Sequence, residues 1–134
     1  MNATELMIGD FVMVCGVPRR VESITKKKIG YHLNPQTDKR LYYARLHDVE
    51  PIAITKELLS RNKFLGDCCY WNYHIDEQTR LEYYFHEHRF RRLWCGIDEW
   101  QNHSRVVEVS YMSHCIYLHE LQHACRECGV EIKL

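Results

Sequence analysis

The chain has 134 residues, of which 46% are hydrophobic and 27% charged, a composition that excludes a disordered or fibrous protein and favours one packed domain. Its 18 basic and 18 acidic side chains give no formal net charge, which excludes a global field that would draw it to nucleic acid or an anionic membrane. No apolar run reaches the roughly 18 residues of a membrane-spanning helix, so we expect no membrane partner.

The seven cysteines are an odd number and lack the regular spacing of a disulfide-rich secreted protein. Cys68 and Cys69 are adjacent. The opening residues, Met-Asn-Ala-Thr-Glu, contain neither the basic nor the apolar segment of a signal peptide. We therefore expect a cytoplasmic protein with reduced thiols, a state that leaves zinc binding open.

The first half of the chain predicts short strands. Residues 6–15 are apolar apart from a Gly-Asp pair, which indicates a buried strand with a turn or bulge. A turn at 16–18 predicts a returning strand over 19–25, and the alternation over 28–33 predicts a third. Residues 41–47 are rich in residues that favour strands. We expect a small, curled, SH3-like antiparallel sheet over residues 1–54.

The second half predicts two helices around further strands. Thr55 is a candidate N-cap for a helix through about Lys63, and Ser113 for a C-terminal helix that Gly129 closes. Between them we expect a hairpin that turns over 76–79 and a strand over 106–111. The fold class is therefore α+β, in a single domain of residues 1–134 whose helical part begins at residue 55.

The C-terminal helix contains His119-Glu120-Leu121-Gln122-His123, the pattern with which zinc hydrolases hold a metal and activate water. At 100° per residue, however, Leu118, Leu121 and Cys125 share the face that docks the helix. His119 and His123 then lie on the other, polar side. A catalytic site at His119, Glu120 and His123 is therefore an alternative, and a solvated helix face is the main expectation.

The same helix offers His119, His123, Cys125 and Cys128 as a zinc ligand set. On a continuous helix the histidines and cysteines point in roughly opposite directions, so thiols packed in the core are the simpler interpretation. A second candidate metal site joins His86 and His88, expected on one strand face, with Cys68 and Cys69 on the neighbouring strand. We expect no cofactor, with zinc as the open alternative.

Aromatic and basic side chains interleave between Cys68 and Trp94. This chemistry suits a protein-binding surface, and it also suits single-stranded nucleic acid through phosphate contacts and base stacking. Half-buried aromatics with arginine side chains lying along them explain the pattern equally well. The candidate binding residues are Tyr70, Trp71, Tyr73, Tyr84, His86, His88, Arg89, Arg91, Arg92 and Trp94.

Six segments resemble a known group of proteins: residues 5–12, 16–21, 49–55, 57–59, 117–122 and 129–132. They are similar to small uncharacterised proteins abundant in phages, prophages and mobile elements of gut Bacteroidetes. In that group glutamine is common at the position of Glu120 and asparagine at that of His123. The resemblance therefore implies that the zinc-hydrolase pattern arises from drift on a structural helix.

The resemblance implies no activity. This chain departs from the group in its many cysteines and histidines and in its aromatic region, which leaves room for a function of its own. We expect a non-enzymatic accessory protein of a phage or mobile element that binds a macromolecule, with protein a better partner than nucleic acid. An inhibitor of a host defence system is a specific form of this expectation.

Overall fold

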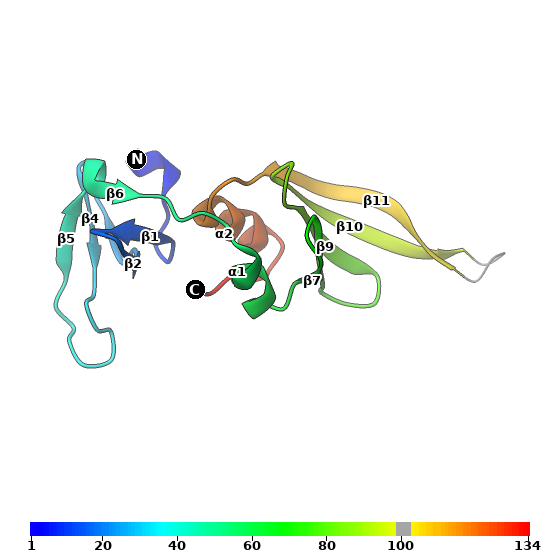
Figure 1. The fold of residues 1–134 in the computed structure, drawn as a ribbon, viewed down its shortest axis with the longest axis horizontal. Helices are drawn as coiled ribbons and strands as arrows, with labels where there is room; N and C mark the ends of the chain where they lie inside the picture. Colours follow the sequence, from blue (N-terminus) through cyan, green and yellow to red (C-terminus); the bar gives the residue numbers. More distant parts are fainter. Residues whose placement is uncertain (99–102) are drawn as a thin grey trace. The chain divides into compact units, whose positions relative to one another are not determined.

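The computed structural model describes residues 1–98 and 103–134, and the side chains of residues 1–95 and 109–134. Short antiparallel sheets and two α-helices make up the fold, which confirms the predicted α+β class (Figure 1). The chain divides into two compact units. The N-terminal unit comprises Met1–Ala53 and Tyr117–Gln122, and the second unit comprises Ile54–Ile116 and His123–Leu134.

The N-terminal unit contains two three-stranded antiparallel sheets, ordered β2-β1-β6 and β3-β4-β5. Its strands are β1 Phe11–Val14, β2 Val17–Arg20, β3 Ser23–Ile24, β4 Lys28–Tyr31, β5 Tyr42–Arg45 and β6 Val49–Glu50. Two single-turn 3-10 helices, η1 Ala3–Glu5 and η2 Leu46–Asp48, precede β1 and β6 respectively. The core of this unit is formed by Leu6, Val12, Val14, Val21, Ile29, Leu46 and Val49.

Two strand predictions for this unit need correction. Residues 6–10 are not part of a strand; the turn expected near the Gly-Asp pair lies at residues 8–9, where Gly9 adopts φ 95°, a left-handed conformation that favours glycine. The predicted strand over 19–25 is split into β2 and β3. The Val21 N–H donates to the carbonyl of Asp10, just before β1. The next N–H, that of Glu22, already donates to the carbonyl of Gly30 in β4.

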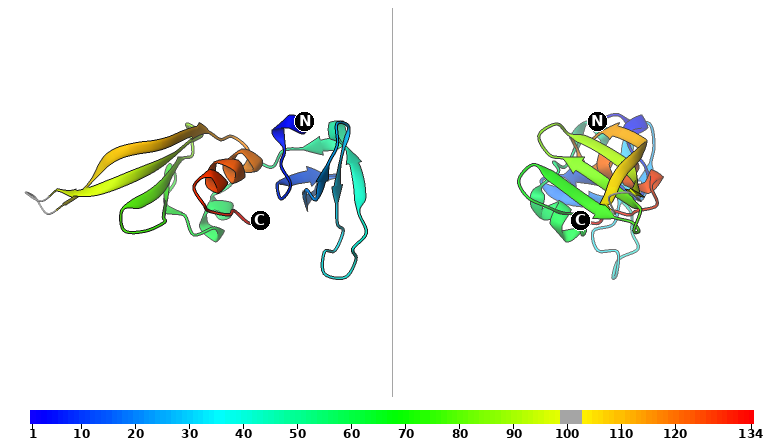
Figure 2. Two further views of the ribbon diagram at one scale, coloured as in Figure 1. Left: turned by 180° about the vertical axis from the view of Figure 1, so that it is seen from behind. Right: turned by 90° about the vertical axis from the view of Figure 1, so that its right-hand side faces the viewer.

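The second unit is built on a five-stranded antiparallel sheet ordered β11-β10-β9-β8-β7. The strands are β7 Leu65–Gly66, β8 Tyr70–His74, β9 Thr79–Tyr84, β10 Arg89–Asp98 and β11 His103–His114. The pairing of β9 with β10 ends at Trp94, so β10 and β11 continue as a two-stranded ribbon beyond the other strands (Figure 2). The predicted strand over 106–111 is part of β11.

Helix α1 (Lys56–Arg61) confirms its prediction: the Thr55 hydroxyl accepts a hydrogen bond from the Leu58 N–H at 3.1 Å, and Leu58 and Leu59 are buried. Helix α2 (Leu118–Glu127) does not begin near Ser113, which lies in β11 opposite Phe90. Gly129 closes α2 as predicted, at φ 78° and with the Val130 N–H bonded to the Cys125 carbonyl. Neither helix has the length and apolar character needed to cross a membrane, among the residues described.

Candidate functional site

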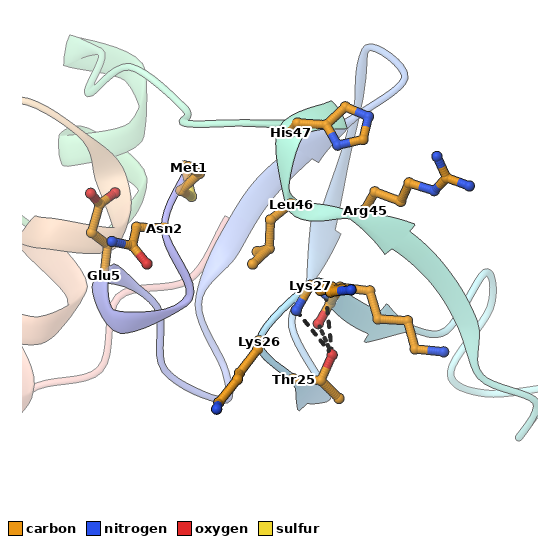
Figure 3. A pocket seen from close by; sticks show the side chains of 10 residues that line it. Met1, Asn2, Glu5, Thr25, Lys26, Lys27, Arg45, Leu46 and His47 are labelled. Atoms are coloured by element: carbon orange, nitrogen blue, oxygen red, sulfur yellow. Dashed lines mark hydrogen bonds between the residues drawn. The ribbon is translucent and has the colours of Figure 1, made fainter.

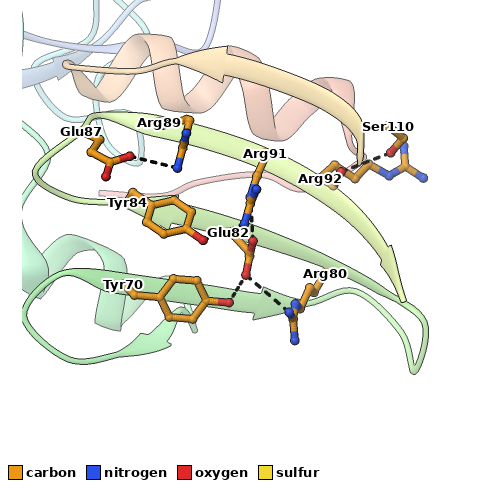
Figure 4. A network of polar contacts seen from close by, with 9 residues as sticks. All are labelled: Tyr70, Arg80, Glu82, Tyr84, Glu87, Arg89, Arg91, Arg92 and Ser110. Carbon is orange, nitrogen blue, oxygen red and sulfur yellow. Dashed lines mark hydrogen bonds and ion pairs between the residues drawn. The ribbon is translucent and has the colours of Figure 1, made fainter. Parts of the chain in front are cut away.

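The predicted binding residues do not form one surface, because alternate side chains of a strand point to opposite faces of a sheet. Cross-strand pairing places Tyr70 beside Tyr84, and Tyr84 beside Arg89. Glu82 pairs with Arg91 in the same way. We call the surface that these side chains form the tyrosine–arginine face; its members are Tyr70, Arg80, Glu82, Tyr84, Arg89 and Arg91 (Figure 4).

Glu82 is the centre of this face, and its side chain is only 3% exposed. The Tyr70 hydroxyl donates to one carboxylate oxygen, and Arg91 Nε donates to the other at 2.8 Å. Arg80 lies 3.5 Å from the carboxylate. A buried carboxylate is tolerated when charged and hydrogen-bonding partners surround it, and here they come from three strands. The alternation of β9 predicts that Glu82 is exposed, so the cluster around its buried carboxylate could not be predicted from the sequence.

The ring of Tyr84 orders the two outer arginines. The guanidinium carbons of Arg89 and Arg91 lie 4.8 Å and 5.1 Å from the ring centre, within cation–π range. Arg91 also donates to the Tyr84 hydroxyl at 2.7 Å. Tyr70 meets the same ring edge-on at 5.3 Å. Arg89 is the most open cation of the face, with 43% of its side chain exposed and an exposed partner, Glu87, at 3.0 Å.

The network also fixes the protonation states of Tyr70 and Arg91. Burial, and then the hydrogen bond to Glu82, raise the pKa of Tyr70 well above its ordinary value. Burial alone would lower the pKa of Arg91, but the hydrogen bond and charge of Glu82 outweigh it and raise that pKa. Tyr70 is therefore a donor and Arg91 a cation across the neutral range.

The remaining predicted binding residues lie elsewhere. Trp71 is buried, and Tyr73 packs against Phe64 with ring centres 5.4 Å apart, on the side of the sheet opposite Tyr70. Arg92 and Trp94 fall on that side too, with Trp94 38% exposed. His86 and His88 lie in the turn between β9 and β10, so the prediction that they share a strand face is wrong.

The zinc-hydrolase residues have structural positions that the sequence did not predict. His119 is only 4% exposed, and its ring stacks on Tyr117 at 6.1 Å, so it does not lie on a solvated face. Glu120, the third residue of α2, accepts a hydrogen bond from the Tyr117 N–H at 3.0 Å. This is the glutamate half of a helix capping box. His119 and Glu120 line a cavity of about 470 Å³, together with Met1, Glu5, Pro51 and Tyr117.

Cys125 in α2 has the character of a core thiol, whereas Cys128 lies half-buried in the turn that follows the helix. Cys125 is fully buried, and burial raises its pKa well above the ordinary value. Burial also raises the pKa of Cys128. A protonated thiol is a poor metal ligand. Among the residues that the structure describes, no three His, Cys, Asp or Glu side chains converge on a point that would hold a metal ion.

A basic cavity in the N-terminal unit had not been predicted. It measures about 1350 Å³ and is lined by residues 25–28, 45–47 and the N-terminal segment (Figure 3). The signal in the sequence is the basic run Lys26-Lys27-Lys28. The turn is held by Thr25, whose hydroxyl accepts from the Lys28 N–H at 3.2 Å. Lys28 extends over the Tyr43 ring at 4.3 Å.

Comparison with known proteins gives no match: no protein-family model, no curated protein and no solved structure matches this chain. The geometry of the described residues is therefore the basis for inferring what the chain binds.

Proposed function

We propose that this chain is a non-enzymatic accessory protein of a phage or other mobile element, and that it binds a protein partner in the bacterial cytoplasm through the tyrosine–arginine face. The observation that carries the proposal is the ordering of Arg89 and Arg91 on the ring of Tyr84. Tyrosine and arginine are the residues that most often dominate the energy of protein interfaces.

Ordering the arginines before contact lowers the cost of binding. An immobilised long side chain typically loses about 0.5–1.5 kcal/mol of rotamer entropy when a complex forms. Here Arg91 is already held by Glu82 and Tyr84, at 2.8 Å and 2.7 Å. Arg80 and Arg91 pair with Glu82 and Arg89 pairs with Glu87, so three arginines meet two carboxylates and one positive charge is left in excess. A protein partner with an acidic segment fits it.

The same geometry favours protein over single-stranded nucleic acid. A nucleic-acid platform needs aromatic faces open for base stacking. The Tyr84 ring is already contacted by two guanidinium groups and by the edge of Tyr70. Carboxylates of a protein partner can instead reach Arg89 without displacing these contacts.

The test uses a tagged chain to capture partners from a lysate of gut Bacteroidetes, with quantification by mass spectrometry. The informative variant is Arg89→Ala, which removes an exposed cation and leaves the buried Glu82 cluster intact. The matched control is Arg20→Ala, because Arg20 also forms an exposed ion pair, with Glu22 at 2.8 Å. We expect a captured protein whose affinity falls roughly 10-fold to 30-fold with Arg89→Ala and is unchanged with Arg20→Ala.

Three results would contradict the proposal. One is that no captured protein depends on Arg89. Another is salt-dependent binding of labelled single-stranded DNA that Arg89→Ala abolishes, which would assign the face to nucleic acid. The third is stoichiometric zinc in protein purified without added metal and lost with His123→Ala, which would support a zinc hydrolase.

The origin in a mobile element rests on the resemblance of the six sequence segments, and the neighbouring genes test it. Phage structural or integration genes beside the coding sequence would support it. A neighbouring or targeted host defence system would support the narrower proposal of a defence inhibitor. We further propose that the two small sheets of the N-terminal unit form a curled, SH3-like module, supported by their short strands and tight turns.

A further inference from the structure

The adjacent cysteines Cys68 and Cys69 lie in the three-residue loop of the β7–β8 hairpin. The loop is tight because Gly66 passes against the next strand: a Cβ there would collide with the carbonyl oxygen of Tyr70. The Asp67 carboxylate accepts from the Cys69 N–H at 3.3 Å, and the Cys69 carbonyl accepts from the Phe85 N–H at 2.9 Å. The backbone that carries the thiols is therefore held on both sides.

The two sulfur atoms are 3.4 Å apart, and both residues are exposed. A zinc–thiolate bond is about 2.3 Å long, so two sulfurs at this separation are close enough for both to bind one ion of similar bond length. We propose that Cys68 and Cys69 form a bidentate thiolate site for one soft cation of the copper(I) class. This site is independent of the tyrosine–arginine face.

A disulfide is the competing fate of neighbouring thiols, and the covalent geometry opposes it. Adjacent Cα atoms across a trans peptide are about 3.8 Å apart, whereas disulfides usually join Cα atoms separated by about 4.4–6.8 Å. The peptide between Cys68 and Cys69 is trans. A bond between their sulfurs would be strained and easily reduced, so the pair persists as two thiols available to a metal.

The donor set selects the ion. Zinc in structural sites takes four ligands, and no third His, Cys, Asp or Glu side chain joins the pair among the described residues. Soft thiolates favour copper(I). Binding releases one proton from each thiol and leaves a complex of one negative charge, which the nearby Lys56 ammonium partly offsets.

The test is an anaerobic titration of the reduced full chain with copper(I) held by a coloured copper(I) chelator. The wild-type chain is compared with Cys68→Ser, Cys69→Ser and the control Cys15→Ser, which removes another exposed thiol from a turn. We expect the wild type and Cys15→Ser to take up one tightly bound equivalent. Each serine variant at 68 or 69 loses at least about 100-fold in affinity, because the second sulfur no longer binds intramolecularly.

Equal affinity in the wild type and Cys68→Ser would overturn the proposal, as would a loss of affinity in Cys15→Ser of the same size. A rapid loss of both thiols to a stable Cys68–Cys69 disulfide in mild air oxidation would also overturn it, and mass spectrometry of the peptide 64–80 detects that product. None of these outcomes affects the Arg89 experiment, so the two proposals fail separately.

Discussion

The side-chain amide of Gln122 bridges the backbone on either side of Asp10. Its oxygen accepts a hydrogen bond from the Phe11 N–H at 2.8 Å, and its nitrogen donates to the Gly9 carbonyl at 3.1 Å. Gln122 is only 2% exposed. Two segments that are far apart in the sequence, residues 5–12 and 117–122, therefore meet through this one side chain.

Replacing Gln122 with leucine tests this bridge. Leucine keeps much of the volume but leaves the Phe11 N–H and the Gly9 carbonyl without their partner. Each unpaired buried group costs about 1–3 kcal/mol, so we expect a loss of roughly 2–4 kcal/mol in the free energy of unfolding. Urea unfolding measures it. Gln36→Leu, at an exposed loop position, is the control and should shift the midpoint little. Equal shifts in the two variants would contradict a structural role for Gln122.

Glu82→Gln tests the central charge of the tyrosine–arginine face. The amide cannot neutralise Arg91 and Arg80, so we expect a loss of about 2–3 kcal/mol, below the 3–5 typical of fully buried pairs because both arginines are partly exposed. The matched variant is Glu87→Gln, whose carboxylate is 60% exposed and pairs with Arg89. It should cost less than about 1 kcal/mol. Thermal or urea unfolding of both variants gives the comparison.

We expect Tyr70 to make the stability of the folded chain sensitive to alkaline pH. Its pKa is raised in the folded chain, chiefly by burial, so the folded state holds the phenolic proton more tightly than the unfolded state does. The stability that results is complete below about pH 10, the unfolded value, and declines as the pH rises toward the folded value. Tyr70→Phe should remove this part of the decline. Urea midpoints between pH 8 and 11 measure it, and an identical pH slope in both proteins would contradict it.

Features set by local chemistry were predictable from the sequence. Thr55 starts α1 because a hydroxyl before a helix satisfies a free N–H, and Gly129 ends α2 because its φ of 78° favours glycine. Ser113 has the same local chemistry as Thr55, yet it lies in a strand. The pairing of β11 with β10 continues to His114, and this tertiary pairing overrides the capping preference.

The residue types of the site could be predicted from the sequence, but their arrangement could not. Strand alternation places Glu82 on the sheet face away from the buried Leu81 and Tyr83, and only the register that sets it beside Arg91 accounts for its own burial. His119 was misplaced for a related reason, because an angular projection assumes one buried face. In α2, His119 and Gln122 are buried as well as Leu118 and Leu121. Polar residues of this helix are therefore packed or hydrogen-bonded as its apolar residues are packed, and the sequence pattern does not reveal this.

Glu120 offers a direct comparison between the capping and catalytic interpretations of α2. Its carboxylate accepts from the Tyr117 N–H, an interaction that a glutamine oxygen can also make. If capping is its role, Glu120→Ala should lower the free energy of unfolding by about 1 kcal/mol, and Glu120→Gln should lower it much less. Urea unfolding of the two variants measures this difference. A zinc hydrolase would show the opposite contrast, with Glu120→Gln abolishing hydrolysis of a peptide or ester substrate while zinc stays bound, because the amide cannot act as the general base.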